Sequence, residues 1–228
     1  MDNLASYLDY ANHRPDATED DIGDLCQKVL KYGFNSAFVN QTHVKLARQI
    51  MADKGKVGSI VAFPMGAELL ASKIAEAEDT ARAGADELDI SLNVSLIKDN
   101  KWEETLDEMR MLTDSIKTID EKKIVKFILE TGYLTEEEIK KTSQLIVESG
   151  ADFVKTNSGM GPRGASLEDV RVIREAIGNE FRIKVAGGIS TYQKTVAFIE
   201  AGANRIGTSK AIEIVEKKSA DKESIMQE

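Results

Sequence analysis

The sequence is poor in cysteine, proline and histidine, with one, three and two of these residues among 228. A single cysteine cannot form an intramolecular disulfide, and Cys26 lies in the apolar-periodic stretch DIGDLCQKVL, which predicts a small core residue. No cluster of Cys and His has the spacing of a metal site, so we expect neither His13 nor His43 to bind a metal. These absences exclude a disulfide scaffold and favour a reducing compartment, the cytoplasm.

Long apolar runs and an excess of positive charge are also missing. No run approaches the roughly 18 to 20 residues of a membrane span, and the first residues, MDNLASYLDYANHR, lack the pattern of a secretory signal. The formal charge is −9, whereas a nucleic-acid surface needs clustered Lys and Arg. We therefore expect neither a membrane nor a nucleic acid as partner. An anionic ligand would be held by backbone N–H groups and one or two well-placed cations.

A recurring junction organises the chain. A helical stretch ends at Gly, and a small or apolar residue and then Asp or Asn precede the next strand. Gly suits the left-handed position that ends a helix, and Asp or Asn suits the turn into a strand. Intervals of 51, 66 and 52 residues separate the copies, so each interval can hold two βα units and eight units fit the chain. The copies are Gly33-Phe34-Asn35, Gly84-Ala85-Asp86, Gly150-Ala151-Asp152 and Gly202-Ala203-Asn204.

Eight short apolar or β-branched runs predict eight strands, with amphipathic helices between them, the first N-capped by Thr18. This alternation predicts an α/β fold with a parallel sheet: a single-domain TIM (β/α)8 barrel over residues 1–215, followed by a polar tail over 216–228. A doubly wound open sheet is the alternative, but it usually has five or six strands and a Gly-rich fingerprint. The predicted strands are 4–11, 36–40, 58–64, 87–93, 124–130, 153–157, 183–187 and 205–208, and the clearest predicted helices are 18–32, 68–83, 103–119 and 135–149.

Ionisable side chains interrupt several of the apolar strands. They are Asp89, Lys155 and Lys184, with Lys126 and Glu130 on a fourth strand. In a barrel, polar residues at the carboxyl ends of strands face the active site. A strand lysine can also point outward between helices and reach water along its apolar stem. The alternative is an amine in a partly dry site, nucleophilic toward a carbonyl.

Two lysines on consecutive strands favour the second interpretation. Neighbouring strands lie about 4.8 Å apart, so Lys155 and Lys184 can approach each other if both point into the barrel mouth. A like charge in a dry site lowers the pKa of an amine. With Asp89 across the barrel as a proton shuttle, the set suits imine chemistry, which needs a nucleophile, a perturbing cation and an acid/base.

Glycine-rich turns follow the last strands. Gly187-Gly188 comes after the seventh strand, and Gly207-Thr208-Ser209 comes after the eighth, before a short helical segment, 210–216. These are the usual positions of a barrel phosphate site, although a plain turn has the same letters. The loop at 158–161 either completes this cradle or is simply flexible.

These strand ends resemble the deoxyribose-phosphate aldolase family over residues 8–215. The resemblance implies that Lys155 is the Schiff-base lysine, that Lys184 lowers its pKa and that Asp89 relays protons. The matching segments are Pro15-Asp16-Ala17-Thr18, Phe63-Pro64-Met65-Gly66, Asp86-Glu87-Leu88-Asp89 with Asn93, Glu130-Thr131 with Tyr133-Leu134-Thr135, Phe153-Val154-Lys155-Thr156, Ala186-Gly187-Gly188-Ile189 and Arg205-Ile206-Gly207-Thr208-Ser209.

By the same resemblance the reaction is the reversible cleavage of 2-deoxy-D-ribose 5-phosphate into acetaldehyde and D-glyceraldehyde 3-phosphate. It needs no metal and no organic cofactor, and members are often homodimers or larger homo-oligomers. The implied phosphate-binding backbone is Gly159, Gly187, Gly188, Gly207 and Ser209. The expected supporting residues are Asp9, Lys126, Glu130 and Thr156.

Several positions depart from the family pattern, among them Asn12 and His13, which stand where two leucines are common. Tyr10 and Ala11 stand where His-Thr is usual, Phe38 stands for a small Cys, Ser190 for an Arg, and Lys210 for a second Ser. We hypothesise that the phosphate cation has moved from the seventh-strand loop to Lys210, which conserves one positive charge. Alternatively, Lys210 is a solvated residue at a helix start.

Two other functions remain open. The changed first and second strands could suit another phosphorylated aldehyde or ketose. A phosphosugar isomerase or binding barrel could instead use Asp89 without an imine, although retention of both Lys155 and Lys184 argues against it.

Overall fold

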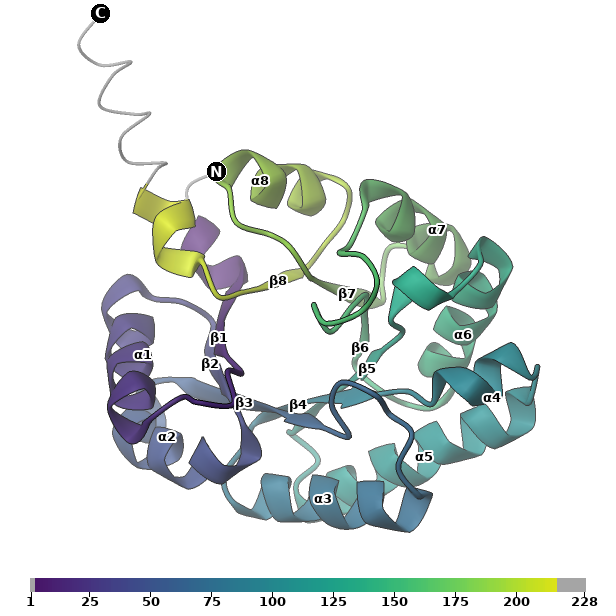
Figure 1. The fold of residues 1–228 in the computed structure, drawn as a ribbon, viewed down its shortest axis with the longest axis horizontal. Helices are drawn as coiled ribbons and strands as arrows, with labels where there is room; N and C mark the ends of the chain where they lie inside the picture. The colour runs from purple at the N-terminus through teal and green to yellow at the C-terminus, as the bar shows by residue number, and fades with distance from the viewer. Residues whose placement is uncertain (1–2, 217–228) are drawn as a thin grey trace, which may run out of the picture.

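Eight parallel strands close into a barrel in chain order in a computed structural model that describes residues 3–216 (Figure 1). The first and last strands pair, with Leu8 opposite Ile206, so the predicted TIM barrel is confirmed and the open sheet is wrong. The strands are β1 (Leu8–Asn12), β2 (Ser36–Val39), β3 (Lys56–Val61), β4 (Glu87–Ser91), β5 (Ile124–Ile128), β6 (Phe153–Lys155), β7 (Arg182–Ala186) and β8 (Arg205–Thr208).

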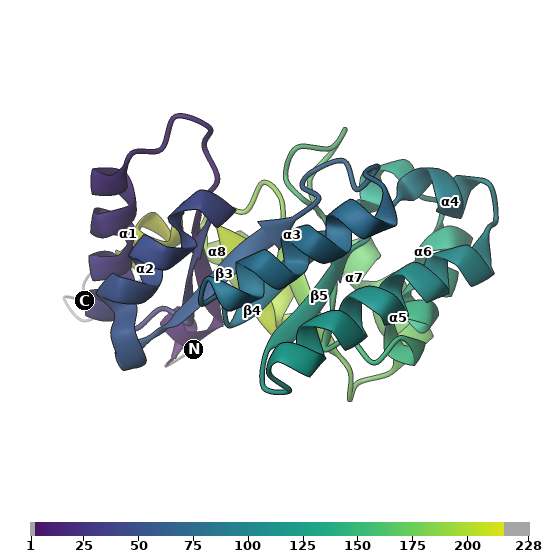
Figure 2. The same cartoon turned by 90° about the horizontal axis from the view of Figure 1, so that it is seen from below.

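Helices form the outer layer of the barrel, and α3 and α5 lie side by side along one wall (Figure 2). Among residues 3–216, no helix has the length and apolarity needed to cross a bilayer. The helices are α1 (Glu19–Tyr32), α2 (Val44–Met51), α3 (Leu70–Arg82), α4 (Val94–Lys98), α5 (Trp102–Ile119), α6 (Glu136–Glu148), α7 (Leu167–Ile177) and α8 (Tyr192–Glu200), with short 3-10 turns at Leu4–Tyr7, Gln41–His43, Ala52–Lys54 and Thr131–Tyr133.

Helix α1 illustrates how the sequence builds this layer. Its N-cap is Thr18, as predicted, and its inner face buries Ile22, Leu25, Cys26 and Val29 against the barrel. Those positions recur at helical spacing, so burial of apolar area holds the helix in place. Cys26 is a core residue, as predicted, and is fully buried.

The strand predictions err mainly at the ends. The predicted first strand began at Leu4, but Leu4–Tyr7 is a 3-10 turn and pairing starts at Leu8. The third and fifth strands end earlier than predicted because the chain bends at Ala62 (φ 51°) and Glu130 (φ 55°). A positive φ is incompatible with an extended strand.

The four glycine junctions have the predicted role. Their glycines adopt positive φ values of 69°, 114°, 78° and 110° at Gly33, Gly84, Gly150 and Gly202. The polar residue that follows ties the start of its strand to the strand before it, since the Asp86 carboxylate accepts a hydrogen bond from Val57 N at 2.8 Å. The side chains of Asp152 and Asn204 accept equivalent bonds from Val125 N and Ile183 N, both at 2.9 Å. These contacts fix the amino-terminal end of the barrel and leave the other end for the site.

The predicted tail lies outside the described residues, apart from Glu216. Residues 211–216 are helical, and the Glu216 carboxylate accepts a hydrogen bond from Tyr32 Oη at 2.6 Å. The boundary proposed at residue 215 stays a prediction.

Removing the α1 cap should destabilise the barrel. Thr18 Oγ1 accepts from Asp21 N at 3.2 Å, and the Asp21 carboxylate accepts from Thr18 N at 2.9 Å. We expect Thr18→Ala to lower the free energy of unfolding by about 1 kcal/mol, because the helix loses a cap. Urea denaturation measures the change, and Thr18→Ser serves as the control that keeps the hydroxyl. Equal stability of both variants would contradict a role for the cap.

Candidate active site

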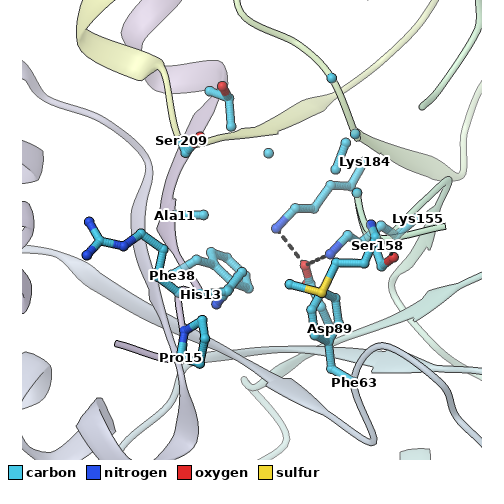
Figure 3. A pocket seen from close by; sticks show the side chains of 18 residues that line it. Ala11, His13, Pro15, Phe38, Phe63, Asp89, Lys155, Ser158, Lys184 and Ser209 are labelled. Atoms are coloured by element: carbon cyan, nitrogen blue, oxygen red, sulfur yellow. Dashed lines mark hydrogen bonds and ion pairs between the residues drawn. The ribbon is translucent and has the colours of Figure 1, made fainter. Parts of the chain in front are cut away.

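A cavity of about 370 Å3 opens at the carboxyl ends of the strands. Lys155, Lys184 and Asp89 line it, and Figure 3 shows both lysines directed toward the Asp89 carboxylate. The wall also contains the glycine turns that the sequence predicted as a phosphate site. The structure therefore brings the predicted strand-end chemistry into one cavity.

The lysine pair owes its geometry to strand register. Lys155 on β6 and Lys184 on β7 are direct partners, so both side chains project to the same side of the sheet. Lys155 Nζ lies 2.8 Å and Lys184 Nζ 2.7 Å from the same atom, Asp89 Oδ2 on β4. The two lysines are 3% and 2% exposed, so the interpretation in which they point outward to water is wrong.

A buried ion network lies beneath this carboxylate. Lys126 Nζ on β5 lies 3.0 Å from Asp89 Oδ1 and 2.7 Å from Glu87 Oε2, and all three side chains are fully buried. Buried charges persist only when they are paired. Lys126 therefore fixes Oδ1 of Asp89 and leaves Oδ2 facing Lys155 and Lys184.

Asp9 holds Lys184 in place. Its Oδ2 lies 2.7 Å from Lys184 Nζ, and its Oδ1 lies 3.1 Å from Arg205 Nη1. Ser36 Oγ and Asn35 Nδ2 donate to the same Oδ1 at 2.6 and 2.8 Å. The predicted supporting role of Asp9 thus takes the form of a fixed carboxylate that holds Lys184 in the cavity.

Burial is the main reason why the pKa of Lys155 falls to about 8. Asp89 opposes this shift, and the charges of Lys184 and Lys126 add to it. The sequence had suggested crowding by a second amine as the principal cause, but desolvation contributes more. For Asp89, burial raises the pKa, yet Lys126, Lys155 and Lys184 outweigh it and hold the pKa well below the usual range. A deprotonated amine is thus accessible beside a stable carboxylate.

Phe38 is a part of the site that the sequence did not predict in detail. Its ring lies under two ammonium groups, with Lys184 Nζ 3.4 Å and Lys126 Nζ 4.9 Å from the ring centroid. An aromatic face attracts a cation and excludes water from it. Phe38, which stands where the family usually has a Cys, therefore gives Lys126 and Lys184 an apolar surface to pack against.

The departures on β1 fall on two different sides of the strand. Ala11 lines the cavity, whereas the Tyr10 ring packs edge-on against Phe34, with centroids 5.7 Å apart. Two residues of the following loop, His13 and Arg14, also line the cavity, and the sequence had assigned neither to the site. Their position at the carboxyl end of the first predicted strand is the signal that could have found them.

Glycines form the cavity wall opposite β4. Gly159, Gly187, Gly188 and Gly207 line it with Ser209. At Gly207 an added Cβ would meet Lys184 Cε at 3.1 Å, so a larger residue would press on that lysine. The wall therefore presents backbone to the cavity, which suits an anionic group.

Lys210 lies outside this wall. Its Nζ forms an exposed ion pair with Glu213 at 2.9 Å, three residues along the same helical segment. The prediction that Lys210 supplies the phosphate cation is not supported by this position, because the ammonium group already has a carboxylate partner.

Glu130 and Thr156 position the loop after β6. Glu130 Oε2 accepts from Ser158 N at 3.0 Å, and Oε1 accepts from Asn157 Nδ2 at 3.3 Å. Thr156 Oγ1 donates to Ala186 O at 3.3 Å and accepts from Ala186 N at 3.2 Å. Both side chains therefore act on the backbone around the site. Within residues 3–216, no group of three or more His, Cys, Asp or Glu side chains is placed to hold a metal ion.

A TIM barrel with two buried lysines and a carboxylate at its mouth contains the groups that an aldolase working through a lysine imine needs. The chain belongs to the DeoC/LacD family of aldolases, whose model matches residues 7–212.

Similar proteins span nearly the whole chain. A deoxyribose-phosphate aldolase of Thermococcus gammatolerans is 45% identical over 218 residues, which cover 94% of this chain and 96% of that protein. The structure of "QR15, an Aldolase" superimposes with a TM-score of 0.91 at 38% identity and covers 100% of both chains. A tetrameric deoxyribose phosphate aldolase from Aeropyrum pernix has a TM-score of 0.88 at 28% identity, covering 95% of this chain and 91% of that one.

The rate of imine formation should depend on the protonation state of Lys155. Because the pKa of Lys155 is about 8, its neutral fraction, and with it the rate of imine formation with acetaldehyde, should rise roughly tenfold per pH unit below 8 and level off above it. Lys184→Met removes a charge that lowers this pKa, so the rising limb should move to higher pH. Asp89→Asn removes the opposing carboxylate, so the limb should move to lower pH. Stopped-flow measurement of imine formation tests both shifts, and coincident profiles would contradict the electrostatic account.

Lys210 should contribute little to phosphate binding. Because Lys210 is paired with Glu213, we expect Lys210→Ala to change KM for a phosphorylated substrate by less than about twofold, as for a surface ion pair. Steady-state kinetics checks this, with Glu213→Gln as a control that frees the ammonium group. A tenfold higher KM in Lys210→Ala would instead restore the cation hypothesis.

Proposed function

We propose that this chain reversibly cleaves 2-deoxy-D-ribose 5-phosphate into acetaldehyde and D-glyceraldehyde 3-phosphate, with Lys155 as the Schiff-base nucleophile. The observation that carries the proposal is the shared contact of Lys155 and Lys184 with one oxygen of Asp89. The lowered pKa of Lys155 supports its role, because a neutral amine is needed to attack the aldehyde. The deoxyribose-phosphate aldolases similar to this chain support the choice of substrate.

The reaction begins when the Lys155 amine attacks the C1 aldehyde of the open-chain sugar. A proton from the groups around Asp89 lets the carbinolamine hydroxyl leave as water, which gives a protonated imine. The C3 hydroxyl then loses its proton to the same groups as the C2–C3 bond breaks. The electron pair of that bond flows into the imine and leaves an enamine, while C3 becomes the aldehyde of glyceraldehyde 3-phosphate. Protonation of C2 and hydrolysis release acetaldehyde and regenerate the amine.

The proton transfers fall to the groups around Asp89. Lys184 and Asp89 are within hydrogen-bond distance of each other and line the same cavity as Lys155. Positioned acids and bases of this kind contribute on the order of 10²- to 10⁴-fold each. The low pKa of Asp89 suits a role as hydrogen-bond acceptor that orients the lysines and a bound water.

The phosphate is assigned to the glycine wall. Gly187, Gly188, Gly207 and Ser209, with Gly159 from the loop after β6, line the same cavity as Lys155. Backbone N–H groups bind a phosphate without a broad positive field, which fits the net charge of −9. A cavity of about 370 Å3 is at the lower end of the size range of small-molecule sites.

A second candidate keeps the Schiff base and changes the substrate. Ala11 and Phe38 line the cavity and differ from the residues that the family pattern has there, so the wall could fit another phosphorylated aldehyde or ketose. A non-imine isomerase or binding barrel has less support, since it gives the two buried lysines no role. Homo-oligomerisation also stays a prediction, favoured by the tetrameric Aeropyrum pernix relative.

Borohydride trapping tests the nucleophile. In the presence of acetaldehyde and borohydride, we expect peptide mass spectrometry to find an ethyl group on Lys155, because reduction fixes the imine. Lys155→Met should give no adduct and lose retro-aldol activity by at least about 10³-fold, as expected for loss of a covalent nucleophile. Full retro-aldol activity with Lys155 unmodified would exclude the mechanism, and a panel of sugar phosphates separates the two candidate substrates.

A further inference from the structure

His13 is a cavity residue that the proposed mechanism leaves unused. It follows β1, and its ring packs edge-on against Phe38 with centroids 6.4 Å apart and at a tilt against Phe63 with centroids 5.6 Å apart. In Figure 3 the imidazole lies beside Phe38, and Lys155 and Lys184 lie on the other side of the view. The two aromatic contacts hold the ring in one orientation at the edge of the cavity.

The imidazole of His13 is neutral at physiological pH. Burial lowers its pKa to about 3, the charges of Lys155 and Lys184 add to the shift, and Asp89 and a hydrogen bond with Asn40 oppose it only in part. A neutral imidazole has one N–H donor and one acceptor nitrogen. It can therefore form hydrogen bonds without adding charge beside the lysine pair.

One nitrogen of this ring is left over. His13 Nδ1 is buried and has no hydrogen-bond partner among residues 3–216. The residue as a whole is partly exposed and lines the cavity, so the ring edge that carries Nε2 is the part that a ligand group can reach.

The proposed substrate has one polar group without an assigned partner. Its C1 is attached to Lys155, its C3 oxygen must exchange a proton near Asp89 and Lys184, and its phosphate lies at the glycine wall. The C4 hydroxyl remains, between the reacting carbons and the phosphate. A hydroxyl both donates and accepts, so it fits either tautomer of a neutral imidazole.

We propose that the His13 imidazole hydrogen-bonds the C4 hydroxyl of the sugar phosphate and thereby selects acceptor aldehydes with a hydroxyl next to the carbonyl. The inference rests on the proposed function, because it concerns the substrate of that site. His13 is then a specificity-determining residue of the C–C bond-forming direction. A site built to pair a hydroxyl discriminates against the analogue that lacks it, because its own polar atom stays unpaired.

The test compares two acceptor aldehydes in condensation with acetaldehyde: D-glyceraldehyde 3-phosphate and 3-phosphooxypropanal, which lacks the hydroxyl. We expect the wild type to prefer the hydroxylated acceptor in kcat/KM, and His13→Leu to reduce this preference roughly ten- to hundredfold. His13→Gln retains a donor and an acceptor and should regain part of it. His43→Leu, the same change at the other histidine, should leave the preference unaltered.

The outcomes separate the inference from the proposed function. An equal loss for both acceptors in His13→Leu and His13→Gln, or an unchanged preference, would overturn the role of His13 while the reaction stands. If the wild type forms the acetaldehyde adduct on Lys155 but condenses neither acceptor, the proposed substrate is wrong and the inference falls with it. A collapse of the preference in His13→Leu with partial recovery in His13→Gln supports the inference, since a purely structural residue would not distinguish the acceptors.

Discussion

The site depends on one carboxylate oxygen, Asp89 Oδ2, which two buried ammonium groups share at 2.7 and 2.8 Å. Burying a lysine in a barrel core is costly unless a counter-charge compensates it. Asp89 provides that charge for Lys155, Lys184 and, through its other oxygen, Lys126. Without it, three cations would face one another in the interior. The same carboxylate that permits their burial therefore brings the lysines together.

The charge balance of this network identifies which amine can lose its proton. Each of Lys126, Lys184 and Arg205 contacts two buried carboxylates, whereas Lys155 contacts one among the described residues. Asp9, Glu87 and Asp89 thus balance four buried cations with three negative charges, while Lys56, which also contacts Glu87 at 3.6 Å, is half exposed. Deprotonation of the cation with the fewest partners removes the excess, in agreement with the lowered pKa of Lys155. The acidity of the proposed nucleophile is consequently a property of the whole barrel interior.

The sequence predicted the features that depend on a local pattern of residues. It did not predict the features that depend on how deeply a side chain is buried or on where it points. Glycine junctions and strand-end lysines repeat in the sequence, so the barrel and the pairing of Lys155 with Lys184 could be predicted. The depth of Lys155 could not, and burial turned out to lower its pKa more than the second amine does. The sequence did not assign His13 to the cavity, because its surroundings are built by Phe38 of β2 and Phe63 of the loop after β3. The phosphate role of Lys210 stays a prediction, because the sequence does not show that its charge has a carboxylate partner, Glu213, one turn away.

The unusual residues of β1 and β2 change the wall of the cavity and leave its charges intact. Along β1, side chains alternate between the two sides of the sheet, so Asp9 joins the ion network and Ala11 lines the cavity, while Tyr10 packs outside against Phe34. Phe38 adds a ring beneath Lys184 without adding charge. Imine chemistry needs the network, whereas substrate choice needs the wall. These two strands can therefore diverge in sequence and alter which aldehyde fits while the proton and electron transfers stay the same.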